Sequence, residues 1–210
     1  MSDGKDAVSP APVSGPKVTP APLAEMSERT REVMSHALFD RDGEPLTIFA
    51  TVARHPKLFA SWLPFAGRLL SGGSLDRRLT ELVILRVAWN MGSNYEWGQH
   101  AEISAALGIP RVDIDRITAG PRAAGWSPLE AQVLEATDEL HTLRRITDAT
   151  WNELHQNLDD AQLIELCFLV GHYEMLAMFL NTVGVPLEAG KESLPRPPVS
   201  PVSPEKTSGD

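Results

Sequence analysis

The chain has little cysteine and no block of positive charge. Its 210 residues include a single cysteine, Cys167, which excludes a disulfide within the chain and a CxxC redox motif. Low cysteine use of this kind fits a reducing cytoplasm. With 19 Lys and Arg against 28 Asp and Glu, the formal net charge is −9. That balance disfavours binding to nucleic acid or to an anionic membrane surface.

Signals for secretion and for a membrane are also scarce. Residues 1–22 contain no apolar segment of the kind found in signal peptides. The longest apolar stretch, residues 163–180, is interrupted by Glu165, His172 and Glu174, which indicates a buried helix and not a membrane span. Strand-like alternation and Asn-Gly hairpins are absent as well. Together these features predict an all-α cytoplasmic protein.

Proline is concentrated at the two ends of the sequence. Ten of the 17 prolines fall within residues 1–24 and 191–210, among Ser, Ala and Val. Proline fixes φ and removes a backbone donor, and the small neighbours offer little to pack. We therefore expect disordered arms at 1–24 and 191–210 around one helical domain at 25–190. Partner-binding tails and solvated linkers both remain open as roles for these arms.

The central part of the sequence has the periodicity of successive helices. Residues 46–73 predict two helices split before Pro56, because the residue before proline disfavours the α region. Residues 75–91 are apolar around most of the helix circumference, which predicts a central buried helix that ends at Gly92. Further helices are expected over about 94–107, 111–118 and 128–143, from about 148, and over about 160–181.

Chemically active side chains gather in the segment after Gly92, which reads GSNYEWGQH. Glu96 and His100 are four residues apart, so they share one face of a helix. A carboxylate beside an imidazole suits general acid–base catalysis. Glu81 lies in the preceding apolar helix, where burying a carboxylate without a partner is costly. In an antiparallel pair the helical rise puts Glu81 about 16 Å and His100 about 12 Å from the turn, so a cluster is expected.

Purely structural roles remain open for each of these residues. Ser93 and Glu96 have the spacing of a capping box, so Glu96 can serve only as a helix cap. His100 can be an ordinary packed side chain. A metal bound by Glu96 and His100 would have two ligands and no HExxH motif, so no metal is expected. Glu81 can instead pair with a nearby arginine, namely Arg77, Arg78 or Arg86.

A family resemblance rests on residues 77–110, RRLTELVILRVAWNMGSNYEWGQHAEISAALGIP. This segment resembles the carboxymuconolactone decarboxylase family, within the alkyl hydroperoxidase D-like all-α superfamily. Residues 46–73 and 126–188 look like the rest of that domain, so the resemblance covers about 25–190. It implies a compact multi-helix protomer that forms a homo-oligomer, a dimer, trimer or hexamer. Active sites in the family lie near the paired helices and the subunit contacts.

The resemblance also implies which chemistry is expected. The peroxidase branch uses a glutamate, a CxxC and a histidine, which fall here on Glu81, Ser93, Glu96 and His100. Both thiols are missing, so the peroxidase activity that the family label carries is not expected. The decarboxylase branch has a glutamate four residues before the histidine, as Glu96 precedes His100. The YEWxxH pattern marks a subgroup without the CxxC.

The expected activity is therefore that of a cofactor-free decarboxylase, a carbon–carbon lyase of aromatic compound catabolism. Its substrate would be a small carboxylated lactone or unsaturated organic acid. His100 would act as the acid, oriented by Glu96, with Glu81 completing the relay. Four further side chains are expected to bind substrate, either as a fork on a carboxylate or by hydrogen bonds: Arg77, Arg78, Tyr95 and His172.

Two alternative functions remain open beside this one. A thiol peroxidase would depend on Cys167. A non-catalytic helical oligomer would use Glu96 only as a cap and His100 only for packing. The Cys167→Ser variant distinguishes the first alternative, and the Glu96→Gln and His100→Ala variants distinguish the second.

Overall fold

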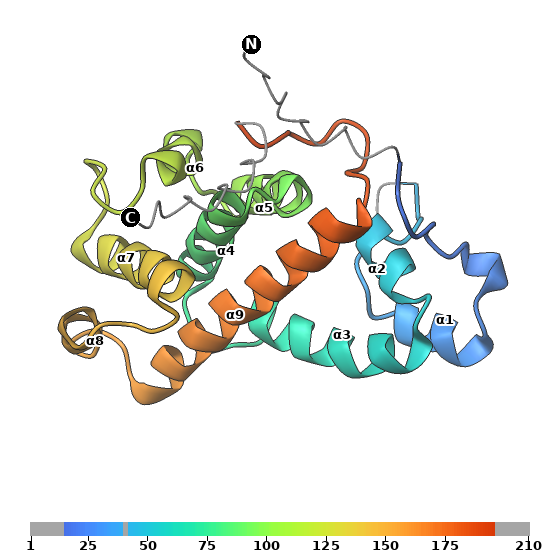
Figure 1. Ribbon diagram of the computed structural model, residues 1–210, viewed down its shortest axis with the longest axis horizontal. Coiled ribbons are helices and arrows are strands. Elements are labelled where there is room, and N and C mark those ends of the chain that lie inside the picture. Colours follow the sequence, from blue (N-terminus) through green and yellow to red (C-terminus); the bar gives the residue numbers. More distant parts are fainter. Residues whose placement is uncertain (1–14, 40–41, 196–210) are drawn as a thin grey trace, which may run out of the picture.

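The computed structural model describes residues 15–39 and 42–195, and within these ranges it contains helices and no strand (Figure 1). The predicted all-α class is therefore confirmed. The elements in chain order are η1 (Leu23–Glu25), α1 (Glu28–Met34), α2 (Thr47–Val52), α3 (Pro56–Ser71), α4 (Arg77–Met91), α5 (Asn94–Ala106), α6 (Arg111–Arg116), η2 (Ile117–Ala119), α7 (Pro128–Leu143), α8 (Asp148–Leu154) and α9 (Asp160–Val183).

Local signals set most helix boundaries where the sequence predicts them. The split before Pro56 separates α2 from α3. A complete capping box, with Ser127 and Glu130 bonded in both directions, begins α7. Helix α1 is not anticipated by the sequence analysis. It begins after Ser27, whose hydroxyl accepts a hydrogen bond from the Thr30 backbone N–H.

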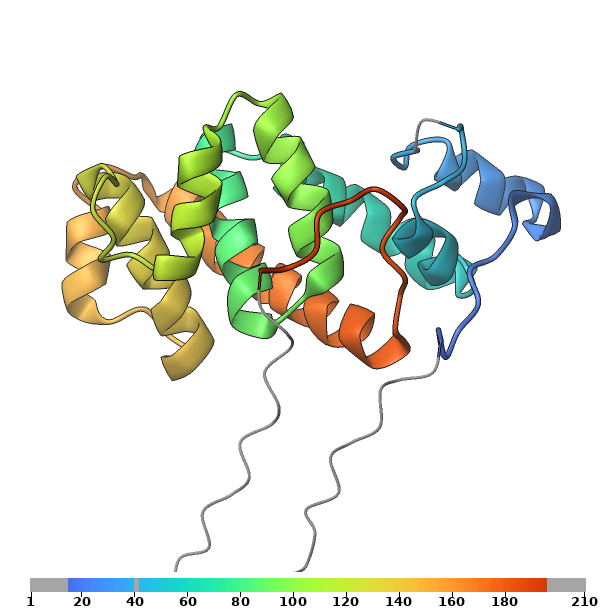
Figure 2. The ribbon, with the colours of Figure 1, turned by 90° about the horizontal axis from the view of Figure 1, so that it is seen from above.

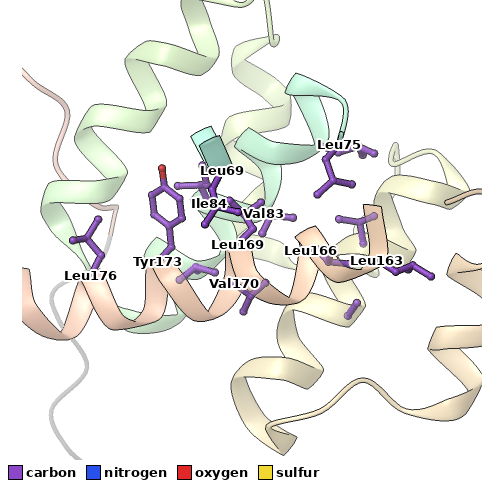
Figure 3. Packing of buried hydrophobic residues seen from close by; sticks show 14 of the residues in the cluster. Leu69, Leu75, Val83, Ile84, Leu163, Leu166, Leu169, Val170, Tyr173 and Leu176 are labelled. Atoms are coloured by element: carbon purple, nitrogen blue, oxygen red, sulfur yellow. The ribbon is translucent and has the colours of Figure 1, made fainter. Parts of the chain in front are cut away.

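Helix α4 is the centre of the structure, in contact with α5, α7 and α9 (Figure 1). The four consecutive side chains of residues 82–85 are fully buried, which confirms the predicted apolar circumference. Helix α9 crosses α4 on one side, where Leu166, Leu169 and Val170 pack beside Val83 and Ile84 (Figure 3). A smaller cluster joins α1, α2 and α3, and α3 of this group contacts α9.

Helix α9 is apolar on both its inner and its outer side. By length and composition it is the one helix of the described residues that could cross a membrane, and half of its most apolar window is buried within the protein. Its outer side exposes four large apolar side chains, Ile164, Phe168, Met175 and Met178. The expected homo-oligomer stays a prediction.

The structure also describes residues 15–24 and 191–195, which lie outside the expected 25–190 domain. The Ala21 N–H donates to the Ala50 carbonyl before η1. After α9, residues 185–195 turn back and run over α5 (Figure 2). Leu187 lies so near Gly98 that a Cβ there would come within 2.7 Å of it, so glycine permits this crossing. The disorder expected at 1–14 and 196–210 lies outside the described residues.

Candidate functional site

The hairpin of α4 and α5 turns at Gly92, which has a left-handed backbone with φ of 61°. The Ser93 hydroxyl then accepts a hydrogen bond from the Glu96 N–H and begins α5. A left-handed residue is most easily supplied by glycine, which has no Cβ to clash. The two helices run back along each other from this turn, so Glu81 and His100 lie side by side, as their spacing predicts.

Glu81 holds the His100 ring through a direct hydrogen bond. Nδ1 of His100 lies 2.7 Å from Oε2 of Glu81, and the Glu81 side chain is 0% exposed. Because a carboxylate only accepts, Nδ1 is the donor, and Nε2 is left as the nitrogen that exchanges protons. The second oxygen of Glu81 accepts from Arg77 at 3.1 Å. The orienting group for His100 is therefore Glu81, and not Glu96, the residue predicted for that role.

Glu96 is buried beside this pair without a hydrogen-bond partner. Neither carboxyl oxygen is bonded within the described residues, although the residue is only 2% exposed. Burial raises the pKa of Glu96 well above its usual range, and the Ser93 hydroxyl opposes part of that shift, so the site favours the protonated form of this carboxyl. In contrast to Glu130 in α7, Glu96 does not complete a capping box. A helix cap therefore does not account for this side chain.

A cavity of about 180 Å³ lies against this face of α5. A row of rings in contact leads along it: His100 packs edge-on against Tyr173 at 5.2 Å between centroids, and Tyr173 against His172 at 5.2 Å. Trp62 then stacks on His172 at 6.2 Å. Among the described residues that line the cavity there is no lysine or arginine. The lining residues used below are Phe49, Trp62, Glu96, His100, His172 and Tyr173.

Unpaired polar atoms are concentrated around this cavity. Nδ1 of His172 and Nε1 of Trp62 are buried and lack a hydrogen-bond partner within the described residues, as do both oxygens of Glu96. Burial lowers the pKa of His172 to about 4, so the ring is neutral at neutral pH. Most buried polar groups in proteins are paired, and those that are not call for an explanation such as a ligand site. His172, predicted to bind substrate, does line the cavity.

Tyr95 lines the cavity, but its hydroxyl is already engaged. It donates to Oε1 of Glu188 at 2.9 Å and accepts from the Ile48 N–H at 3.2 Å. Burial raises the pKa of this phenol. Gln99 donates to the other oxygen of Glu188, and the Thr47 N–H donates to Oε1. Glu188 thus joins α5 to the start of α2. Because the Tyr95 hydroxyl is used in these bonds, Tyr95 holds the cavity wall in place and is not free to bind a ligand through that hydroxyl.

The two neighbouring arginines have different surroundings. Arg78 forms ion pairs of 2.6 Å with Asp113 and with Glu130, away from the cavity. Arg77 is paired with Glu81, and its other terminal nitrogen, NH1, is buried and has no partner within the described residues. Neither arginine lines the cavity. The structure therefore does not bring the expected arginine fork to a bound carboxylate.

Cys167 lies on α9 and is not among the cavity-lining residues. Burial raises the pKa of its thiol, which lowers the thiolate fraction at neutral pH. No group of three or more metal-ligating side chains occurs within residues 15–39 and 42–195. Neither observation adds a thiol or a metal to the site.

Several residues of the cavity were not singled out from the sequence. Trp62 and Tyr173 come from segments far from α5, and only the packing of α3 and α9 brings them to the cavity, while Glu188 of residues 185–195 bonds to the lining residue Tyr95. The one local signal was His172, a polar residue in an apolar run, whose neighbour is Tyr173.

The comparisons with known proteins agree with this architecture. The model of the Carboxymuconolactone decarboxylase family matches residues 56–139, a range that contains Glu81, Glu96 and His100. No curated protein gives a significant match to the chain.

Solved structures with a similar fold include two peroxidase-related proteins. An uncharacterized peroxidase-related protein from Ralstonia eutropha JMP134, described as an alkylhydroperoxidase AhpD core, has a TM-score of 0.72 and 16% identity, covering 84% of this chain and 95% of that chain. An uncharacterized peroxidase-related protein from Silicibacter sp. TM1040 has a TM-score of 0.71 and 16% identity, covering 85% and 96%.

A debrominase has a similar fold as well. A cysteine-to-alanine variant of the debrominase Bmp8, in complex with 2,3,4-tribromopyrrole, has a TM-score of 0.69 and 13% identity, covering 82% of this chain and 91% of that chain. At such identities the likeness concerns the fold, and the chain has the AhpD-like fold.

Proposed function

From the match of residues 56–139 to the model of the Carboxymuconolactone decarboxylase family, we propose that the protein is a cofactor-free acid–base enzyme. Its reaction is the decarboxylation of a small unsaturated acid or carboxylated lactone. The observation that carries the proposal is the hydrogen-bonded pair of Glu81 and His100 beside the buried Glu96, with His100 and Glu96 in the wall of one cavity.

His100 is the group that moves the proton. The bond between the carboxylate carbon and the neighbouring substrate carbon breaks, CO₂ leaves, and the electron pair remains on the substrate as an enolate. Protonated His100 then gives its Nε2 proton to that carbon and takes another from water. Glu81 fixes Nδ1 and balances the charge of the ring. General acid–base help of this kind contributes about 10²–10⁴-fold to the rate.

Glu96 stabilises the enolate oxygen as a hydrogen-bond donor. A carboxyl that keeps its proton at neutral pH offers an O–H where an ionised one offers only acceptors. Glu96 is buried and its oxygens form no regular hydrogen bond within the described residues, so only the nearby Ser93 hydroxyl stands beside this donation. Donors aimed at developing charge in a dry site contribute strongly to rate.

The AhpD-like structures named for peroxidase or debrominase activity raise the alternative of thiol chemistry. The chain does not support it. Ser93 and Glu96 stand at the positions where the resemblance places the two cysteines, and Cys167 lies outside the cavity lining. Acid–base chemistry, in contrast, needs only carboxyl and imidazole groups, which Glu81, Glu96 and His100 supply.

A ligand screen tests the proposal. We would follow thermal unfolding of the wild type, Glu96→Gln and His100→Ala with small carboxylated lactones, β-keto acids and unsaturated acids. Compounds that raise the wild-type midpoint then go into a CO₂-release assay. We expect release by the wild type and a loss of about 10²–10⁴-fold in folded His100→Ala. Equal release by both proteins, or no release from any compound that binds, would contradict the proposal.

A further inference from the structure

The end of the cavity remote from His100 has its own chemistry. It is formed by Phe49, Trp62 and His172, with Trp62 in contact with both of the other rings at 5.9 Å and 6.2 Å between centroids. We call these three residues the aromatic end. Tyr173 lies between them and His100, and in Figure 3 its ring rises from α9 on the side of Leu69 and Ile84.

No lysine or arginine lies at the aromatic end to balance a charged ligand, and the only histidine of the described lining besides His100 and His172 is His36. Lysine and arginine are absent from the described lining, and the lowered pKa of His172, about 4, keeps that ring neutral. Moving an unpaired carboxylate from water into such surroundings is strongly unfavourable. The aromatic end therefore favours an uncharged part of a ligand.

The aromatic end contains a buried hydrogen-bond donor. An indole N–H only donates, and Nε1 of Trp62 has no acceptor within the described chain although it is buried. The neutral ring of His172, stacked on Trp62, has an unpartnered Nδ1 as well. A buried polar group without a partner is unfavourable, so a ligand that brings an acceptor gains binding free energy.

The size and shape of the cavity narrow the ligand further. An apolar cavity of about 150 Å³ is large enough for benzene. The present cavity, at about 180 Å³, has room for one planar ring with a small substituent. Flat aromatic walls favour a flat ligand through stacking and edge contacts.

We propose that the aromatic end binds an uncharged planar ring or conjugated group with one hydrogen-bond acceptor, such as a carbonyl oxygen, directed to Trp62. The substrate is then a monoacid: its single carboxylate lies at His100, and its remainder is neutral. This identification of the substrate rests on the proposed function only for the position of the reacting carboxylate. Binding at the aromatic end requires no catalysis.

Binding of two flat isosteres tests the proposal. Acetophenone and α-methylstyrene differ in a carbonyl oxygen against a CH₂ group, and their affinities for the wild type can be measured by ligand-observed NMR. We expect acetophenone to bind about tenfold more tightly, the value of one net hydrogen bond. Equal affinities would overturn the proposal without the need for any variant.

Two tryptophan variants then test whether Trp62 causes the preference for acetophenone over α-methylstyrene. Trp62→Phe keeps an aromatic ring and removes the N–H, so acetophenone and α-methylstyrene should bind it equally. The matched control is Trp97→Phe, because Nε1 of Trp97 is also buried and unpartnered but Trp97 does not line the cavity. In folded Trp97→Phe the preference should persist. A preference that survives in Trp62→Phe would overturn the assignment to Trp62.

His100→Ala and benzoate separate this inference from the proposed function. The preference for acetophenone should persist in His100→Ala, because it depends on Trp62. Normal CO₂ release by His100→Ala would contradict the proposed function and would leave this inference unaffected. Benzoate, the charged probe, should lose affinity in His100→Ala and not in Trp62→Phe. The opposite result would place a carboxylate at the aromatic end and contradict its neutrality.

Discussion

Two groups of polar side chains lie around α4, and they differ in how completely they are paired. Arg78 bonds to Asp113 and Glu130, and Asp113 also bonds to Arg116. Around the cavity, in contrast, Glu96, His172 and Trp62 keep polar atoms without partners in the described chain. We call the first group the paired network. The paired network has little hydrogen-bonding capacity left for a ligand, whereas the unpaired atoms beside the cavity can still bond to one.

The same difference in pairing separates Arg77 from Arg78, the two arginines predicted to bind a substrate carboxylate. From the sequence, Arg77 and Arg78 are equivalent candidates for a carboxylate. Helical geometry turns them about 100° apart, so Arg78 meets α6 and α7 while Arg77 meets Glu81. The same residue type therefore has a structural role on one face of α4 and a place beside the candidate site on the other.

The largest expected effect is on CO₂ release, when a side chain at the cavity is replaced. His100→Ala should reduce CO₂ release by about 10²–10⁴-fold, because no other group would carry the proton. Glu81→Gln should reduce it less, since the imidazole remains but loses its anionic partner. Initial rates at saturating substrate measure both effects. Activity in Glu81→Gln below that in His100→Ala would contradict the assignment of Glu81 as a positioning residue.

A second effect concerns the donor at Glu96. Glu96→Ala removes the donor and should lower the turnover rate by about 10²–10³-fold. Glu96→Gln retains an N–H donor and should keep part of that rate. Comparing kcat of the two folded variants provides the measurement. If Glu96→Gln were as inactive as Glu96→Ala, proton transfer by the carboxyl itself would replace hydrogen-bond donation in the mechanism.

The paired network should respond in the opposite way. Arg78→Ala leaves Asp113 and Glu130 without their shared partner and should lower the free energy of unfolding by about 1–3 kcal/mol, with little change in kcat. Chemical denaturation of Arg78→Ala measures this loss. The matched control is Arg111→Ala, because Arg111 is exposed and its pairs with Asp115 and Glu192 are worth at most about 1 kcal/mol. A fall in kcat with unchanged stability would move Arg78 into the site.

A smaller effect is the pH dependence that Glu96 adds to stability. Its folded pKa is raised above the usual 4.5, so the folded state keeps a proton that the unfolded state releases. This contribution is fully present below pH 4.5 and is lost as the pH rises towards the folded pKa. The stability of Glu96→Gln relative to the wild type should therefore increase with pH. Urea unfolding across that range tests it, and a constant difference would mean that folding does not raise the pKa of Glu96.

The smallest expected effect is at Cys167. Cys167→Ser should leave both CO₂ release and ligand binding unchanged, because the thiol does not line the cavity. Peroxide turnover by the wild type that disappears in this variant would instead support thiol chemistry.

The sequence predicts the helices and one contact of the site, and it does so for local reasons. Caps, prolines and periodicity set α2 to α9, and the turn at Gly92 with a constant helical rise places Glu81 beside His100. The unpaired state of Glu96 could not be predicted, because its spacing from Ser93 also fits a capping box. Trp62 reaches the cavity, and Glu188 reaches Tyr95 in its wall, through long-range packing, which no local pattern encodes.

The protonation state of Glu96 tests the central claim most directly. Infrared difference spectra between the wild type and Glu96→Gln at neutral pH separate a protonated carboxyl from a carboxylate. The account predicts the C=O stretch of a carboxylic acid in the wild type, lost in Glu96→Gln. Carboxylate bands alone in that difference would contradict the account, because an ionised Glu96 cannot donate a hydrogen bond to an enolate.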